Sequence, residues 1–116
     1  MWQEKPHRSV SMPATFNLMS ASEMAPLLEA TKTRFEKRFK VDKVVFLSKA
    51  WENTNTTNNA NEVTGRKALI GIITKDGTDT VIRQYILSQP GSGKAWEDRF
   101  FFYPAPDGNS VPARLK

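Results

Sequence analysis

Hydrophobic and polar positions fall into four strand-like stretches after residue 40 and one helix-like stretch before it. The clearest stretch extends from Lys67 to Leu87, where the apolar run KALIGIIT leads through Asp76-Gly77 into TDTVIRQYIL. An Asp-Gly pair tolerates the positive φ angles that a two-residue loop between antiparallel strands requires. We therefore predict a β-hairpin with strands at 67–75 and 78–87 and its turn at 75–78.

Both faces of the first hairpin strand are apolar, which predicts a central place in the sheet. Ala68, Ile70 and Ile72 share one face, and Leu69, Gly71 and Ile73 share the other. A glycine inside a strand marks either a bulge or the close approach of another group. At Gly71 we favour the bulge.

A helix is predicted before these strands. Its apolar stripe consists of residues three or four positions apart, Leu27, Leu28, Thr31, Phe35 and Phe39, so the helix should end near Phe39. Two starts fit the sequence. Ser20 and Glu23 have the spacing of a capping box, but with this start Pro26 falls past the first turn, which predicts a short turn followed by a kink. A start near Met24 would instead place Pro26 in the first turn, where proline is tolerated.

The β-branched and aromatic stretch 41–51 and the run RFFFY within 98–103 complete the expected elements. We predict an α+β fold in which one N-terminal helix packs on a four-stranded antiparallel meander sheet, with strands at 41–51, 67–75, 78–87 and 98–103. Residues 1–14 should be an extended arm, 15–103 a single domain and 104–116 an extended tail. An open sheet and half a barrel both fit this pattern.

The composition bounds the class of protein. A chain of 116 residues can bury a core as one domain, and the lack of cysteine excludes disulfides, thiolate metal sites and cysteine nucleophiles. It also suits a reducing compartment. No apolar run approaches the roughly 20 residues that span a bilayer, and the opening MWQEKPHRSV lacks the apolar region of a signal peptide. We expect a cytoplasmic protein without membrane contact.

Few residues suggest catalysis. His7 is the only histidine, and no carboxylates stand at metal-ligand spacing. The segment GSGK lacks the other positions of a phosphate-binding loop. Glu97 and Asp98 are adjacent in a predicted strand and would point to opposite faces. We expect no enzyme, no catalytic residue, no metal and no cofactor.

Charge changes the picture, because 17 Lys and Arg against 12 Asp and Glu give a net charge of +5. Such a balance favours acidic partners. The cations either form a solvated face or an anion-binding patch. Six candidates fall within a dozen positions at the end of the predicted helix and just after it, and two lie on later predicted strands: Lys32, Arg34, Lys37, Arg38, Lys40, Lys43, Arg83 and Arg99.

A second set of candidates lies outside the regular elements. The stretch 52–66 has five asparagines and four threonines, and it is either a polar interface or a mere insertion. A tryptophan in an irregular segment suggests docking on a partner or on the domain itself. The candidate protein-interaction residues are Trp2, Asn55, Asn58, Asn59 and Trp96.

Two functions follow as hypotheses. The first is a non-enzymatic protein-interaction module, an assembly subunit or an inhibitor of a larger machine, which binds an acidic protein, another protein or a second copy of itself. The alternative is single-stranded nucleic-acid binding through the basic residues and aromatic side chains of the sheet. The aromatic residues that could stack on bases are Tyr85, Phe101, Tyr103, Trp51 and Trp96.

The residues KAW at the end of the first predicted strand, then a polar loop, then RKALIGI, resemble small uncharacterised prokaryotic and phage α+β domains. This resemblance covers roughly a third of the chain, and because a fold does not imply a function, none comes with it. It implies a phage-encoded or prokaryotic protein.

Overall fold

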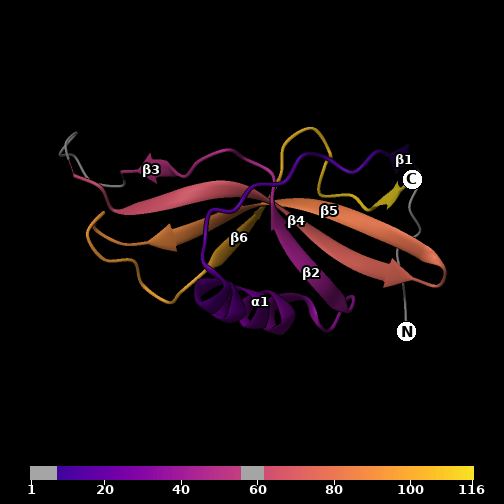
Figure 1. The fold of residues 1–116 in the computed structure, drawn as a ribbon, viewed down its shortest axis with the longest axis horizontal. Coiled ribbons are helices and arrows are strands. Elements are labelled where there is room, and N and C mark those ends of the chain that lie inside the picture. The colour runs from indigo at the N-terminus through magenta and orange to yellow at the C-terminus, as the bar shows by residue number, and fades with distance from the viewer. Residues whose placement is uncertain (1–7, 56–61) are drawn as a thin grey trace.

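The computed structural model describes residues 8–55 and 62–116. This part of the chain forms an α+β fold with one helix and a single mixed sheet of seven strands (Figure 1). In chain order the elements are β1 (Ser9–Val10), α1 (Ala21–Phe35), β2 (Val41–Phe46), β3 (Glu52–Thr54), β4 (Gly65–Asp76), β5 (Asp79–Pro90), β6 (Phe101–Pro104) and β7 (Ala113–Leu115).

The long hairpin of β4 and β5 forms the centre of the sheet. Its two strands pair without interruption from Gly65 and Pro90 at the open end to Asp76 and Asp79 at the turn. Twelve extended residues span roughly 40 Å, and the molecule is 47 Å along its longest axis. The hairpin therefore runs almost the length of the molecule (Figure 1).

Each outer edge of the hairpin is shared by two short strands. β4 pairs with β3 through residues 65–67 and with β2 through 70–74. β5 pairs with β7 through 81–82 and with β6 through 85–88. The four predicted strands do pair in succession as β2, β4, β5 and β6, but the predicted four-stranded antiparallel meander is wrong, because the described sheet has seven strands and one parallel pair.

The parallel pair joins the predicted arm to the predicted tail. The N–H of Arg114 donates to the carbonyl of Arg8 at 2.8 Å, and the N–H of Lys116 donates to Val10 at 3.0 Å. Val10 and Leu115 pack with Ala113 over one end of the hairpin. The arm and tail thus contribute β1 and β7. Both strands are too short to show a periodic pattern from which they could be predicted.

The predicted polar stretch 52–66 begins as a strand. β3 pairs with β4 from Glu52 opposite Lys67 to Thr54 opposite Gly65, and the N–H of Thr64 donates to the carbonyl of Thr54 at 2.9 Å. These bonds anchor both ends of the stretch to the sheet. Residues 56–61 lie outside the described part of the chain.

The hairpin turn lies one residue later than predicted. Asp76 pairs with Asp79, so the two loop residues are Gly77 and Thr78. Gly77 has a φ of +64°, and a type II′ turn takes glycine at this first loop position. Gly71 does not mark a bulge, because β4 and β5 pair continuously there. A Cβ at Gly71 would lie 2.8 Å from Cδ1 of Ile82 and 3.2 Å from Cγ2 of Val45, so the glycine marks the close approach of two neighbouring side chains.

The helix begins at the first of the two predicted starts. Ser20 is the N-cap, its hydroxyl accepts from the N–H of Glu23 at 3.3 Å, and its own N–H donates to Oε1 of Glu23 at 3.0 Å. Pro26 lies inside the helix. The helix ends at Phe35 rather than near Phe39, because the chain turns there and brings Phe39 onto the ring of Phe35, with 5.2 Å between centroids.

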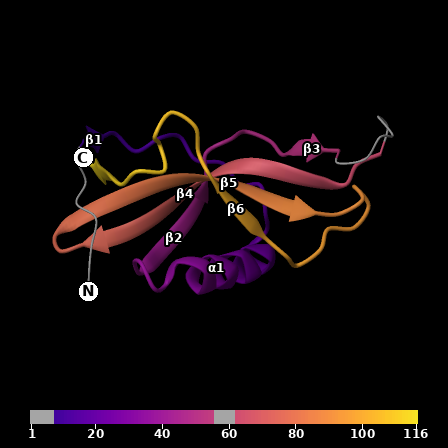
Figure 2. The same ribbon diagram turned by 180° about the vertical axis from the view of Figure 1, so that it is seen from behind.

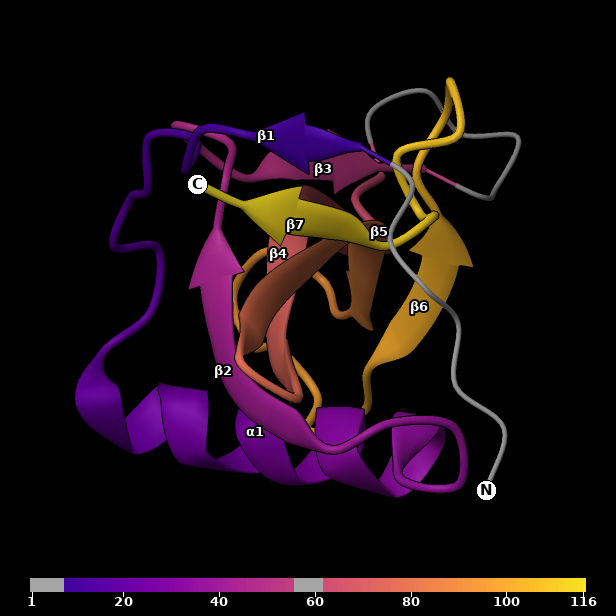
Figure 3. The same cartoon turned by 90° about the vertical axis from the view of Figure 1, so that its right-hand side faces the viewer.

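Helix α1 covers one face of a curved sheet. Along the long axis, β2 and β6 lie on opposite sides and α1 lies across the space between them (Figure 3), and the view from behind shows the helix beneath the same strands (Figure 2). The core between helix and sheet is apolar. Its buried members are Leu27, Phe35, Val41, Val44, Phe46, Ala68, Ile70, Ile72, Tyr85 and Leu87.

Candidate functional site

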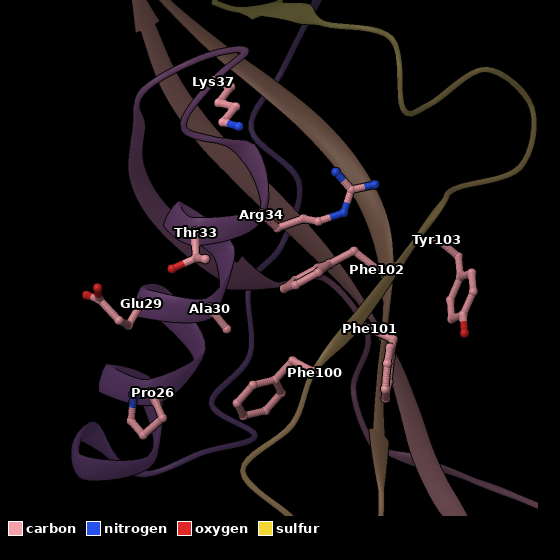
Figure 4. A pocket seen from close by; sticks show the side chains of 10 residues that line it. All are labelled: Pro26, Glu29, Ala30, Thr33, Arg34, Lys37, Phe100, Phe101, Phe102 and Tyr103. Atoms are coloured by element: carbon pink, nitrogen blue, oxygen red, sulfur yellow. The ribbon is translucent and has the colours of Figure 1, made fainter.

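A groove separates α1 from β6 and has a volume of about 820 Å³ (Figure 4). One wall of the groove is α1, and the other is β6 together with Phe100, which precedes it. No strand pairs with the outer edge of β6 among the described residues, since β5 is its one partner there. The groove is lined by Pro26, Glu29, Ala30, Thr33, Arg34, Lys37, Phe100, Phe101, Phe102 and Tyr103.

The aromatic run alternates between the core and the surface, because successive side chains of a strand point to opposite faces. Phe100 and Phe102 pack against the core, and the Phe102 ring meets Phe35 edge-on with 5.5 Å between centroids. Phe101 and Tyr103 remain 45% and 54% exposed. Two large aromatic rings therefore stand on the surface beside the groove.

The backbone of β6 has one occupied edge and one open edge. The N–H of Ala105 donates to the carbonyl of Gln84 in β5 at 3.4 Å. The direction of the backbone N–H and C=O groups alternates along a strand. Those of Phe101 and Tyr103 therefore point toward β5, as the N–H of Ala105 does, and those of Phe102 point outward. Pro104 takes the next outward position, where its missing N–H costs the sheet nothing.

The helical wall supplies the charges of the groove. Ala30, Thr33, Arg34 and Lys37 follow helical spacing, so they lie on one side of α1 and its C-terminal turn. Arg34 extends toward the strand, above Phe102 (Figure 4), and its Cζ lies 5.1 Å from the ring centre of Phe35. Neither Arg34 nor Lys37 forms an ion pair within the described residues. The groove thus combines an apolar floor with a basic rim.

A buried arginine fixes the segment that leads into β6. Cζ of Arg66 lies 3.9 Å from the ring centre of Trp51 and 4.5 Å from that of Trp96. Its Nε donates to Oε1 of Gln89 at 2.9 Å, and Nε2 of Gln89 donates to the carbonyl of Glu97 at 2.7 Å. We call Trp51, Arg66, Gln89 and Trp96 the arginine cluster. It holds the 96–97 segment, and so sets where β6 starts.

The electrostatics of this cluster involve the helix N-terminus. Burial lowers the pKa of the Arg66 guanidinium, and the negative charge of Glu23 opposes this effect. An arginine nevertheless stays protonated at neutral pH. Glu23 accepts from the backbone N–H and then from the hydroxyl of Ser20, and these bonds lower the pKa of its carboxyl, with a smaller contribution from Arg66.

The structure separates the predicted basic residues into different environments. Arg34 and Lys37 line the groove, whereas Arg83 is buried, with its Cζ 4.0 Å from the ring of Phe39 and Nη1 donating to Thr74. Arg99 pairs with Glu97 at 2.8 Å. The others are exposed and are not among the residues that line the groove: Lys32, Arg38, Lys40 and Lys43.

The predicted protein-interaction residues are also scattered. Trp2, Asn58 and Asn59 lie outside the described residues. Asn55 is exposed just after β3. Trp96 is half-buried against Arg66, so its nearest partner is within the chain itself.

Several residues of the groove and cluster were not among the candidates chosen from sequence, among them Arg66, Phe100 and Phe102. Phe101 and Tyr103 were named for stacking alone. A signal for β6 existed in the sequence, because three phenylalanines and a tyrosine followed by proline fit an edge strand. No comparable local signal marks Arg66 as buried.

Within residues 8–55 and 62–116 there is no cluster of three or more His, Asp or Glu that could hold a metal ion. No helix in the same ranges is long and apolar enough to cross a membrane. Comparison with protein-family models, with curated proteins and with solved structures gave no match.

We predict that Arg66→Lys lowers the free energy of unfolding by about 1–3 kcal/mol, because lysine lacks the planar guanidinium that contacts two indole rings while its Nε donates to Gln89. Urea denaturation followed by tryptophan fluorescence measures this. Arg99→Lys, at an exposed ion pair, should change stability by less than about 0.5 kcal/mol. Equal losses in the two variants would contradict a special role for the arginine cluster.

The capping box predicts a pH effect. Because the folded pKa of Glu23 is lowered, its charge stabilises the fold above the unfolded pKa, and this contribution is lost as the pH falls through the folded pKa. Glu23→Gln should therefore reduce the loss of stability between pH 7 and about pH 3. Glu29→Gln, on the same helix without a capping contact, should leave that loss unchanged in urea titrations at both pH values.

Proposed function

We propose that this chain is a non-enzymatic protein-interaction module that binds an extended segment of a partner protein along β6. The observation that carries the proposal is the open edge of β6 beside an 820 Å³ groove. An assembly subunit and an inhibitor of a larger machine would both use such a site. The lack of cysteine is compatible with the cytoplasm, where we propose that it acts.

Binding would proceed by β-strand addition, in which a partner segment becomes the next strand of the sheet. Phe102 offers its outward N–H and C=O, and Pro104 offers its C=O. The partner's alternate side chains would then point into the groove toward α1 and over the exposed rings of Phe101 and Tyr103. Main-chain bonds supply affinity in this arrangement, and the side-chain sites supply selectivity.

The site suits a short contact. Pro104 has no N–H, so the outward-facing backbone donors of β6 end at Phe102 and only a few main-chain hydrogen bonds are available. The aromatic rings must therefore supply much of the binding free energy. Buried aromatic side chains are the common anchors of protein interfaces. The exposed rings of Phe101 and Tyr103 form no aromatic or cation–π contact with the residues that the structure describes, which is consistent with this use.

We expect peptides selected from a displayed random octapeptide library to protect the Phe102 amide from hydrogen exchange, and Phe101→Ala/Tyr103→Ala to weaken their binding at least about 10-fold. Fluorescence anisotropy with synthetic copies of the selected peptides measures the affinity. Met12→Ala/Val111→Ala removes two apolar side chains of similar exposure elsewhere and should change it less than about twofold. Selected peptides that protect other amides would contradict the proposal.

Single-stranded nucleic-acid binding is the second candidate, and one observation favours it: Phe101 and Tyr103 are exposed beside Arg34 and Lys37. Bases could stack on these rings while the cations meet phosphates. Binding of a twelve-residue oligo-dT at two salt concentrations distinguishes the candidates. Steep salt dependence together with loss of binding in Phe101→Ala/Tyr103→Ala would favour nucleic acid, whereas weak binding that the alanine variant leaves unchanged favours the protein partner.

A further inference from the structure

The rim of the groove is charged asymmetrically. Arg34 and Lys37 stand beside the strand end that holds Phe102 and Tyr103, while the groove's single carboxylate, Glu29, lies one to two turns earlier on α1. No described carboxylate pairs with either cation. A ligand in the groove therefore meets, at one end, two positive charges that no carboxylate of residues 8–55 and 62–116 neutralises.

A second copy of the chain is a poor occupant of this groove. Two β6 strands paired antiparallel across a two-fold axis at Phe102 would bring the Arg34 side chains of both copies near that axis. Like charges opposed in this way are destabilising. The charges instead favour an occupant that carries negative charge at the same end.

We propose that the segment bound along β6 is acidic, with at least one carboxylate placed against Arg34 and Lys37 and apolar side chains directed between Phe100 and Phe102. The proposal rests on the function proposed above and adds the chemistry of the partner. Charge complementarity of this kind selects partners and fixes the register of binding. Both an Asp or Glu side chain and a free chain terminus could supply the carboxylate.

The test uses the full chain and the same octapeptide library. We expect selected peptides to be enriched in Asp or Glu at one position relative to their apolar residues, and Arg34→Glu/Lys37→Glu to weaken their binding about 10-fold or more. A selection repeated on that variant should enrich Lys or Arg at the same position. Peptides with free and with amidated C-termini distinguish a terminal carboxylate from a side chain.

Lys32→Glu/Lys40→Glu is the matched control, because it changes the net charge equally at exposed positions off the groove. It should alter affinity less than about twofold. An equal loss in both variants, or selected peptides without acidic enrichment whose binding survives the Arg34→Glu/Lys37→Glu change, would overturn the inference. If those same peptides still protect the Phe102 amide of β6 from hydrogen exchange, the proposed function stands. If they do not protect it, the proposed function and this inference are both overturned.

Discussion

The rest of the structure depends on the unbroken pairing of β4 with β5. A strand has two hydrogen-bonding edges, and in this hairpin one edge of each strand is used along twelve residues by the other. The remaining edges are long enough to hold two short strands each, one near the turn and one near the open end. The helix, the groove and the pair of β1 with β7 all take their positions from that division.

The same hairpin carries two buried arginines on the face that α1 covers. Arg66 lies opposite Gln89 at the open end, and Arg83 lies opposite Ile72 nearer the turn, with the apolar core between them. Arg66 lies against two aromatic rings and Arg83 against one, and the face of such a ring attracts a cation. The apolar region of this face is thus bounded at both ends by charged groups whose contacts depend on the position of the surrounding rings.

Local patterns in the sequence predict the parts of the fold that depend on local physics. The hairpin, the apolar stripe at Leu27, Thr31 and Phe35, and the capping box at Ser20 all have such signatures. β1, β3 and β7 do not, because two or three residues cannot show a period and their pairing is decided by distant segments. The basic helix end was predicted, but which cations face a groove depends on where β6 lies relative to α1.

The burial of Arg83 and Arg66 shows the same limit. In sequence Arg83 interrupts an apolar strand, and Arg66 ends the polar stretch that precedes the predicted strand at 67–75. Neither pattern shows which residues cover the side chain. Phe39 covers Arg83 only because the helix ends four residues early, and Trp96 reaches Arg66 only through the 91–97 segment. Contacts between segments that are far apart in the sequence, rather than residue type, therefore bury both arginines.

The position of Pro104 has a consequence for the behaviour of this protein at high concentration. An open strand edge with exposed aromatic side chains is a template on which further strands can stack, and such edges promote aggregation. A proline at an outward position interrupts that template after very few bonds, while its ring leaves the pairing with β5 intact. The chain can therefore keep a usable edge and still resist growth into fibres.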